Sequence, residues 1–392
     1  MHRNLKLMKW FNFFLSFKPY NPIAIVYFAQ VTKSYALALL VFSIFSISTC
    51  IFEIPTGIYS DRIGRKKTLM FGVLASILCV AFYAIGGSFW FLAIGAIFAG
   101  LSDSLFSGNN DSLIYDTLAE TNEQKTLDEH LGKINAMIPL GLGTSAIIAT
   151  FVFGFSLSWI FWFSIVPLAI ALVIGFQLVE PKIQRAANSG NVYSHLRESF
   201  IAFKQNNKLR DLSLSSILNF GMGEVENQFM PAFISTVWPV WALGISKAMN
   251  NLFTFLGSHQ AGPILKKFFS FKVLIVGQVI GMAVTVLAVL YSGVWSPILI
   301  ALTSIAFGVT SIALNALMHR EFSNQQRATM GSINSFFGNI FFAIFAYLFG
   351  LVADRLGVKG PIIITETLSL SVVYLYWRLF KNYQKEVVKN YD

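Results

Sequence analysis

The chain alternates between long apolar runs and short polar interruptions over its whole length. Most runs reach the roughly 20 apolar residues that a helix needs to cross about 30 Å of hydrocarbon. Only helices or closed barrels satisfy their own backbone polar groups in lipid, and the sequence has no apolar–polar alternation at period two, so the runs predict helices. We expect twelve spans, near residues 9–30, 36–58, 68–88, 90–113, 133–153, 157–179, 210–234, 240–261, 271–292, 296–317, 327–350 and 360–380.

The first span is the least regular, because Lys18, Pro19, Asn21 and Pro22 interrupt it. A broken helix that lines a cavity tolerates such residues. No small-residue cleavage pattern follows the basic N-terminal segment and its apolar run. We therefore expect this segment to be retained rather than removed as a signal peptide.

Composition strengthens the prediction of an all-α membrane protein. Apolar residues make up 55% of the 392 residues and charged residues only 12%, with a mean hydropathy of +0.63, which is too apolar for a soluble domain of this length. Both cysteines, Cys50 and Cys79, fall inside predicted spans and fit apolar packing. The nucleotide-binding, metalloprotease and hydrolase motifs lack supporting context, so we expect no enzyme activity, no cofactor and no metal site.

The basic residues predict the orientation of the chain in the membrane. Most of the 29 lysines and arginines fall at the N-terminus, in the loops after even-numbered spans, or in the C-terminal tail. The opposite side holds only Lys33, Lys247, Arg355 and Lys359. Both termini should therefore face the cytoplasm. We interpret the net charge of +10 as topology and contact with anionic lipid, not as nucleic-acid binding.

A polar stretch from Glu180 to Arg210 divides the spans six and six. We expect an N-terminal six-helix bundle over 1–180, a cytoplasmic linker over 181–209 with an amphipathic helix around 193–204, a C-terminal bundle over 210–381 and a cytoplasmic tail over 382–392. A faint repeat relates the halves, since Gly57, Lys66 and Lys67 recur 200 residues later as Gly257, Lys266 and Lys267.

The segment between the second and third spans is the most informative in the chain. Gly57-Ile58-Tyr59-Ser60-Asp61-Arg62-Ile63-Gly64-Arg65-Lys66-Lys67 carries five charges and two glycines, as in a short cytoplasmic hinge between two membrane helices. It resembles the loop signature of the major facilitator superfamily, and the preceding Phe52-Glu53-Ile54-Pro55-Thr56 resembles the exporter-like bacterial branches of that family. The resemblance implies two pseudo-symmetric six-helix bundles around a midplane cavity, which opens alternately to each side.

The same resemblance implies that this loop belongs to a latch that closes the cytoplasmic side. We expect Asp61 at the N-terminus of a helix that begins near Arg327 in the other half, where free amides favour an anion. Gly57 would permit close helix approach, and Arg65 would pair with Asp116. Arg62, Lys66 and Lys67 would meet lipid phosphates, with Gly64 completing the motif. The alternative is that these charges only fix topology.

Ionised side chains inside the spans mark candidate transport residues, because each costs at least about 2.5–3.5 kcal/mol at the bilayer centre. Lys18, Asp103, Glu224 and Glu226 stand midway along the first, fourth and seventh spans. The resemblance places these three helices around the cavity, so we expect Lys18, Asp103 and Glu224 to converge there. A structural interhelical contact is the alternative for either glutamate, and Glu53 and Glu366 are secondary candidates.

The fourth and seventh spans each carry a polar face. Asp103, Ser107, Asn110 and Asp111 recur at helical spacing and predict a face towards water. An adjoining stripe of small residues, Ala96, Gly100, Ser104 and Gly108, predicts a groove for a neighbouring helix. Glu224 shares a face with Asn227 and Gln228, whereas Glu226 is rotated by about 200° and should pack against another helix.

These features together predict a proton-coupled secondary transporter. We expect an exporter of an amphipathic small organic molecule, in which Lys18 neutralises Asp103 or Glu224 and changes partner on protonation. An uptake permease for a metabolite or siderophore-like compound is the first alternative, and a transporter-like receptor or scaffold the second. The expected partners are a small-molecule substrate, protons and membrane lipids, and we expect the protein to be a monomer.

Overall fold

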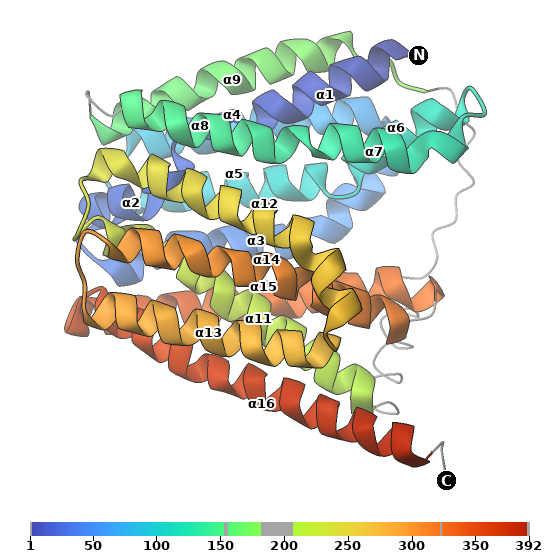
Figure 1. Ribbon diagram of the computed structural model, residues 1–392. Coiled ribbons are helices and arrows are strands. Elements are labelled where there is room, and N and C mark those ends of the chain that lie inside the picture. The colour runs from blue at the N-terminus through green and yellow to red at the C-terminus, as the bar shows by residue number, and fades with distance from the viewer. Residues whose placement is uncertain (1, 153–155, 182–206, 322–323, 390–392) are drawn as a thin grey trace. The chain divides into compact units, whose positions relative to one another are not determined.

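The computed structural model describes residues 2–152, 156–181, 207–321 and 324–389. In these residues all the regular elements are helices (Figure 1). They are α1 (His2–Ser16), η1 (Asn21–Ile23), α2 (Ala24–Thr32), α3 (Tyr35–Ile63), α4 (Arg65–Ile85), α5 (Phe89–Phe106), α6 (Asn109–Ala119), η2 (Gln124–Thr126), α7 (Leu127–Asn135), α8 (Met137–Val152), α9 (Leu157–Gln177), α11 (Asn207–Ile234), η3 (Val240–Ala242), α12 (Leu243–Lys267), α13 (Ser270–Leu290), α14 (Ser296–Glu321), α15 (Asn324–Leu356) and α16 (Lys359–Lys389).

Twelve membrane-spanning segments account for these helices. Nine stretches of the described residues are long and apolar enough to cross a membrane. The other three segments are α1 with α2, which is interrupted, and α11 and α12, which carry more polar residues. The predicted all-α membrane fold is confirmed, while the predicted amphipathic helix around 193–204 lies outside the described residues.

The chain divides into two compact units. Unit 1 comprises Met1–Ala186 and Pro239–Ala248, and unit 2 comprises Ala187–Trp238 and Met249–Asp392. In unit 1 the third span packs against the fourth and sixth, and the first against the fifth and sixth. In unit 2 the ninth span packs against the tenth and twelfth, and the seventh against the eleventh and twelfth. The same helix pairs therefore occur in both halves, as expected for two pseudo-symmetric six-helix bundles.

The first span is broken where its sequence predicts. Helix α1 ends at Ser16, and the chain resumes regular structure with η1 and α2. Lys18 and Pro19 lie in the break, and proline has no backbone N–H to donate to a helical hydrogen bond. The break removes Lys18 from a regular helix and places it between two half-helices.

The fourth span differs from its prediction, because it is not one continuous helix. Helix α5 ends at Phe106 and α6 begins at Asn109, with Ser107 outside the helical conformation at ψ 119° and Gly108 at φ +67°. A positive φ is readily adopted by glycine and costs energy for other residues. The helical spacing from Asp103 to Asp111 therefore does not define one continuous polar face.

The predicted small-residue stripe forms a helix contact on α5 but not beyond it. Ala96, Gly100 and Ser104 are buried, and a Cβ at Gly100 would lie 2.7 Å from the Phe45 carbonyl oxygen of α3. The Ser104 hydroxyl donates to the Thr49 carbonyl of α3 at 3.1 Å. Gly108 lies in the break between the helices. It allows the positive φ there and does not pack against a neighbouring helix.

Unit 2 packs its core between α11, α13, α14 and α16. Leu212, Phe271, Ala313 and Tyr376 are among its fully buried side chains. At the edge of this core the Arg378 Nε lies 3.2 Å from the Asp211 Oδ2, and the Asp211 side chain is only 4% exposed. This ion pair ties the first turns of α11 to the C-terminal half of α16.

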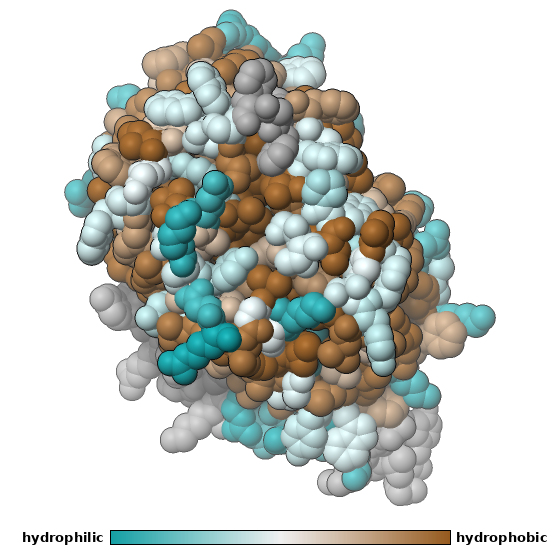
Figure 2. All heavy atoms as spheres, turned by 90° about the vertical axis from the view of Figure 1, so that its left-hand side faces the viewer, coloured by the Kyte–Doolittle hydropathy of each residue, from teal (hydrophilic) through white to brown (hydrophobic). Residues whose placement is uncertain are grey.

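Large apolar side chains are exposed on many of the described helices. Figure 2 shows the face at the left of Figure 1, on which brown apolar side chains are widespread and teal hydrophilic ones are scattered. Large apolar side chains on the spans themselves are also open, among them Ile51, Phe151 and Phe255 at 62%, 79% and 64% exposure. Such exposure fits contact with lipid and does not fit contact with water.

Candidate functional site

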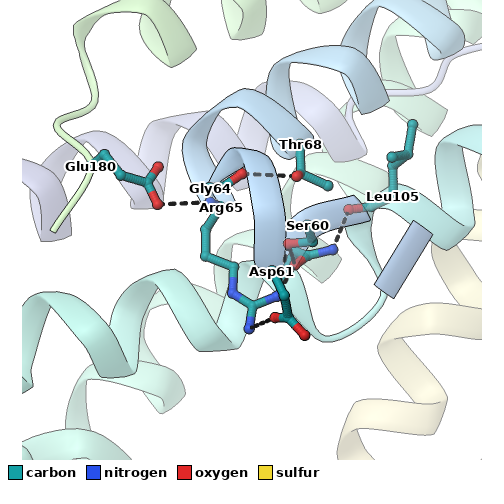
Figure 3. Close-up of polar contacts among 8 residues, drawn as sticks. Ser60, Asp61, Gly64, Arg65, Thr68, Leu105 and Glu180 are labelled. Carbon is teal, nitrogen blue, oxygen red and sulfur yellow. Dashed lines mark hydrogen bonds and ion pairs between the residues drawn. The ribbon is translucent and has the colours of Figure 1, made fainter. Parts of the chain in front are cut away.

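The signature segment is not a loop but the end of one helix and the start of the next (Figure 3). Helix α3 continues through Ile63, Gly64 alone leaves the helical conformation with φ +99°, and α4 begins at Arg65. The predicted hinge is thus one residue long. A Cβ at Gly64 would lie 2.8 Å from the Glu180 carboxylate as well as requiring a strained φ, so this position requires glycine.

Arg65 joins the two helices to α6. Its Nη2 lies 2.9 Å from the Asp61 Oδ1, and its Nη1 donates to the Ser60 hydroxyl and to the Asn109 side-chain oxygen Oδ1, each at 2.7 Å. Ser60 also bonds directly to Asn109. The ion-pair partner of Arg65 is therefore Asp61, one helical turn before it, and not the predicted Asp116. On α6, Arg65 hydrogen-bonds to Asn109.

Glu180 is a residue that the sequence reading missed. Its two carboxylate oxygens accept the backbone N–H groups of Arg65 and Lys66, both at 2.7 Å, at the N-terminus of α4. The Lys66 ammonium donates to the Phe176 carbonyl at 2.9 Å, and its contact with a lipid phosphate stays a prediction. The sequence offered one clue, an acidic residue directly before Pro181 where the sixth span ends.

Replacing Glu180 by alanine should destabilise the protein by about 1–2 kcal/mol, because two helix N-terminal amides lose their acceptor. Glu180→Gln should cost less, since one amide oxygen still accepts. The measurement is thermal unfolding of the purified full-length protein. Glu129→Ala is the matched control, because Glu129 is an exposed acid paired with Lys133 on the same helix. Equal unfolding temperatures for the two alanine variants would contradict the role assigned to Glu180.

The remaining latch residues lie apart from this network. Asp61 is 65% exposed despite its ion pair, and Arg62 is exposed. A Cβ at Gly57 would meet nothing within 4 Å, and its close approach to a helix of the other half stays a prediction. Within unit 1, Gly100 permits close approach between α3 and α5. The docking of Asp61 on the helix near Arg327 joins residues of different units and stays a prediction.

Three charged residues of unit 1, Lys18, Glu53 and Asp103, interact with one another around α5. Asp103 is exposed on α5, and Lys18 in the break of the first span is close enough to attract its carboxylate. Glu53 of α3 is also exposed and repels Asp103. The secondary candidate Glu53 therefore belongs to the same charge cluster as Lys18 and Asp103.

The other predicted polar residues of the fourth span separate at the break. Ser107 and Asp111 are exposed. Asn110 instead forms a reciprocal amide pair with Asn12 of α1, at 2.8 and 3.2 Å. Asn110 therefore fastens α6 to α1. Its amide is hydrogen-bonded to Asn12, whereas the Ser107 and Asp111 side chains are exposed.

In unit 2 the glutamates of α11 have different surroundings. The partly buried Glu224 accepts a hydrogen bond from Gln228 at 2.6 Å, and Asn227 is exposed. Glu226 faces Glu366 of α16, whose carboxylate accepts a hydrogen bond from Thr285 of α13. Glu366 is 4% exposed and Thr285 2% exposed. Sequence reasoning ranked Glu366 low and missed Thr285, since hydroxyls are common in spans and periodicity does not identify cross-helix partners.

Metal chemistry finds no support in the part of the chain that the structure describes. No group of three or more His, Cys, Asp or Glu side chains there is placed to hold a metal ion. The candidate residues instead form two small sets: Lys18 with the carboxylates of Glu53 and Asp103, and the carboxylate of Glu224 with the amide of Gln228. Such sets can bind and release protons or hydrogen-bond a polar solute.

Comparisons with known proteins agree on one family. A family model described as Major Facilitator Superfamily matches residues 10–346. An uncharacterised MFS-type transporter of Bacillus subtilis (strain 168), YxaM, is 22% identical over 375 residues, which cover 91% of this chain and 90% of that protein.

Solved structures resemble the fold as a whole. The crystal structure of the nucleoside transporter NupG has a TM-score of 0.78 at 15% identity, covering 96% of this chain and 99% of that one. The D-xylose-proton symporter has a TM-score of 0.75 at 12% identity, covering 96% and 97%. At these identities the likeness is one of fold alone.

Proposed function

The chain belongs to the major facilitator superfamily and is a multi-pass membrane transporter, and from this premise we propose that it couples the movement of a small organic molecule to protons. The proposed reaction is export of an amphipathic compound by alternating access. Both termini would face the cytoplasm, in the inner membrane of a bacterium, as the distribution of lysine and arginine favours.

The charge cluster of unit 1 is the observation that carries this proposal. Lys18, Glu53 and Asp103 come from three separate spans and interact electrostatically. Charged side chains inside a membrane are costly, so they are rare and mark functional sites. Two carboxylates that repel each other beside a single lysine cannot both be fully neutralised by it. A proton on one carboxylate would relieve the repulsion, which suits a group that gains and loses protons during transport.

Asp103 is the residue we assign to proton coupling, with Lys18 as its counter-charge. When Asp103 is ionised, Lys18 stabilises it; when Asp103 takes a proton, the lysine is released for another acceptor. A ligand or proton shifts a conformational equilibrium only by its differential affinity for the two states. Loss of the Lys18–Asp103 attraction on protonation is such a difference.

The polar face of α11 is assigned to the solute. Glu224 and Gln228 are joined by a hydrogen bond, and Asn227 is exposed beside them. Carboxylate and amide groups at this position would orient the polar part of an amphipathic substrate. Export is favoured over uptake by the likeness of Glu53-Ile54-Pro55-Thr56-Gly57 to exporter sequences.

Reconstitution of the purified protein tests this proposal. Liposomes that hold a pH-sensitive dye would be given a pH gradient and then a panel of amphipathic compounds. We expect substrate-dependent proton flux, with the solute moving against the direction of the protons. Movement of solute and protons in the same direction would instead establish uptake. A compound that raises the unfolding temperature without any proton flux would overturn proton coupling and favour a receptor or scaffold.

A further inference from the structure

Unit 2 carries a surface on which lysines alternate with aromatic side chains. It is formed by the end of α12, the start of α13 and the C-terminal half of α16. We name it the basic–aromatic surface, and its members are Lys267, Phe268, Lys272, Trp377, Phe380 and Lys381.

Each lysine of this surface lies over an aromatic ring. The Lys381 Nζ is 5.0 Å from the centre of the Trp377 ring, the Lys267 Nζ is 5.6 Å from that of Phe268, and the Lys272 Nζ is 6.0 Å from that of Phe380. These distances are those of cation–π contacts. The contacts hold the ammonium groups near the apolar surface.

Two of the three aromatic rings are exposed, and the third, Phe380, is partly buried against the core of unit 2. Phe268 is 53% and Trp377 48% exposed. Phe269 packs against Phe380 with ring centres 6.1 Å apart, which joins α13 to α16 across the surface. Open aromatic rings next to lysines at the ends of spans are typical of the boundary between hydrocarbon and lipid headgroups.

The sequence segments that form the surface are basic. Residues 262–275 and 371–383 contain Lys266 and the three lysines already named but no aspartate or glutamate. The one arginine in these ranges, Arg378, is paired with Asp211. An anion that approaches the surface would therefore meet several free ammonium groups.

Exposed apolar side chains continue from the surface along both helices. On α13, Val276 and Ile280 follow Lys272 at steps of one helical turn and are 54% and 52% exposed. On α16, Tyr374 and Leu370 precede Trp377 and are 57% and 48% exposed. The surface thus offers positive charge at one depth and apolar contact over the next two turns.

We propose that the basic–aromatic surface binds an anionic phospholipid of the inner leaflet. The phosphate would contact Lys267, Lys272 and Lys381, and the acyl chains would follow the open apolar residues of α13 and α16. Basic groups next to spans on the cytoplasmic side recognise anionic headgroups through charge. A zwitterionic headgroup is disfavoured because its own amine offsets the phosphate. This proposal does not depend on proton coupling or on the direction of transport.

Native mass spectrometry of the full-length protein tests the proposal, with equimolar phosphatidylglycerol and phosphatidylethanolamine in the micelles. We expect wild-type protein to retain phosphatidylglycerol preferentially. The variant Lys267→Gln/Lys272→Gln/Lys381→Gln should retain at least about tenfold less, since three headgroup contacts are lost. The variant with arginine at the same three positions should retain it, because the charge is kept.

The matched control is Lys6→Gln/Lys9→Gln/Lys125→Gln, which removes three lysines of unit 1. Equal phosphatidylglycerol retention by the two glutamine variants would overturn the proposal. A second measurement does not use the lysine variants, so a folding defect in them cannot affect it. Quenching of tryptophan fluorescence by brominated lipid is measured for wild type and for Trp377→Phe, and the difference between the two gives the quenching of Trp377. That difference should be larger for brominated phosphatidylglycerol, and equal quenching by brominated phosphatidylethanolamine would also overturn the proposal.

Discussion

Replacing Asp103 by asparagine is expected to reduce proton-driven solute movement by about 100-fold, near the upper end of typical coupling between two ligands. The amide keeps the shape of the side chain but cannot take up or release a proton. Lys18 then has no ionised partner on α5, so protonation no longer changes the Lys18 environment. The measurement is solute transport in liposomes with an imposed pH gradient.

Solute exchange without a gradient separates coupling from binding in this experiment. The Asp103→Asn protein should still exchange labelled for unlabelled solute, because exchange needs a binding site but no net proton movement. Asp128→Asn is the control, since Asp128 is an exposed acid of α7 outside the charge cluster. Full gradient-driven transport by Asp103→Asn would rule out Asp103 as the coupling residue, and Glu53 would be tested next in the same assay.

Replacing Arg378 by leucine is expected to destabilise the protein by about 3 kcal/mol, the lower end of the range for breaking a buried ion pair. The lower end applies because the Arg378 side chain is 41% exposed, and solvent weakens the attraction between a partly exposed charge and its partner. The cost arises mainly from Asp211, whose carboxylate stays buried without its partner. The measurement is unfolding of the purified protein by heat or denaturant.

A double substitution makes this prediction specific. Asp211→Asn combined with Arg378→Leu removes the stranded charge and should recover most of the lost stability. Arg355→Leu serves as the control, because it removes an exposed arginine of the same unit. If Arg378→Leu unfolds at the temperature of the Arg355 control, the ion pair contributes little and the core of unit 2 alone holds α11 to α16.

The helices of this protein are encoded mainly by local apolar runs, which explains why sequence reasoning found them. Span length and composition are local properties, and the break around Lys18 and Pro19 follows from the missing proline N–H. The break at Gly108 was not predicted, because the polar face expected from Asp103 to Asp111 requires a continuous helix. A single glycine, here between Ser107 and Asn109, fits a helix interior and a left-handed residue equally well.

The partners of charged groups depend on three-dimensional packing, and here sequence reasoning was less successful. Arg65 was matched to Asp116 by depth, yet Asp61 one helical turn away is its ion-pair partner. Glu180 lies 115 residues from Arg65 and bonds to its amide, which no periodicity reveals. Within unit 1 Lys18 is close enough to attract Asp103, whereas the convergence of both with Glu224 of unit 2 stays a prediction.

The break at Gly108 also gives the two helices of the fourth span different neighbours. Helix α5 is held to α3 through Gly100 and Ser104, whereas α6 is held to α1 and to Arg65 through its own amides. Across the break, the Asn109 amide of α6 still donates to the Leu105 carbonyl of α5 at 2.9 Å. The change of helix axis at Ser107 and Gly108 therefore lets one span contact α3 with its first half and α1 with its second, which a single straight helix could not do.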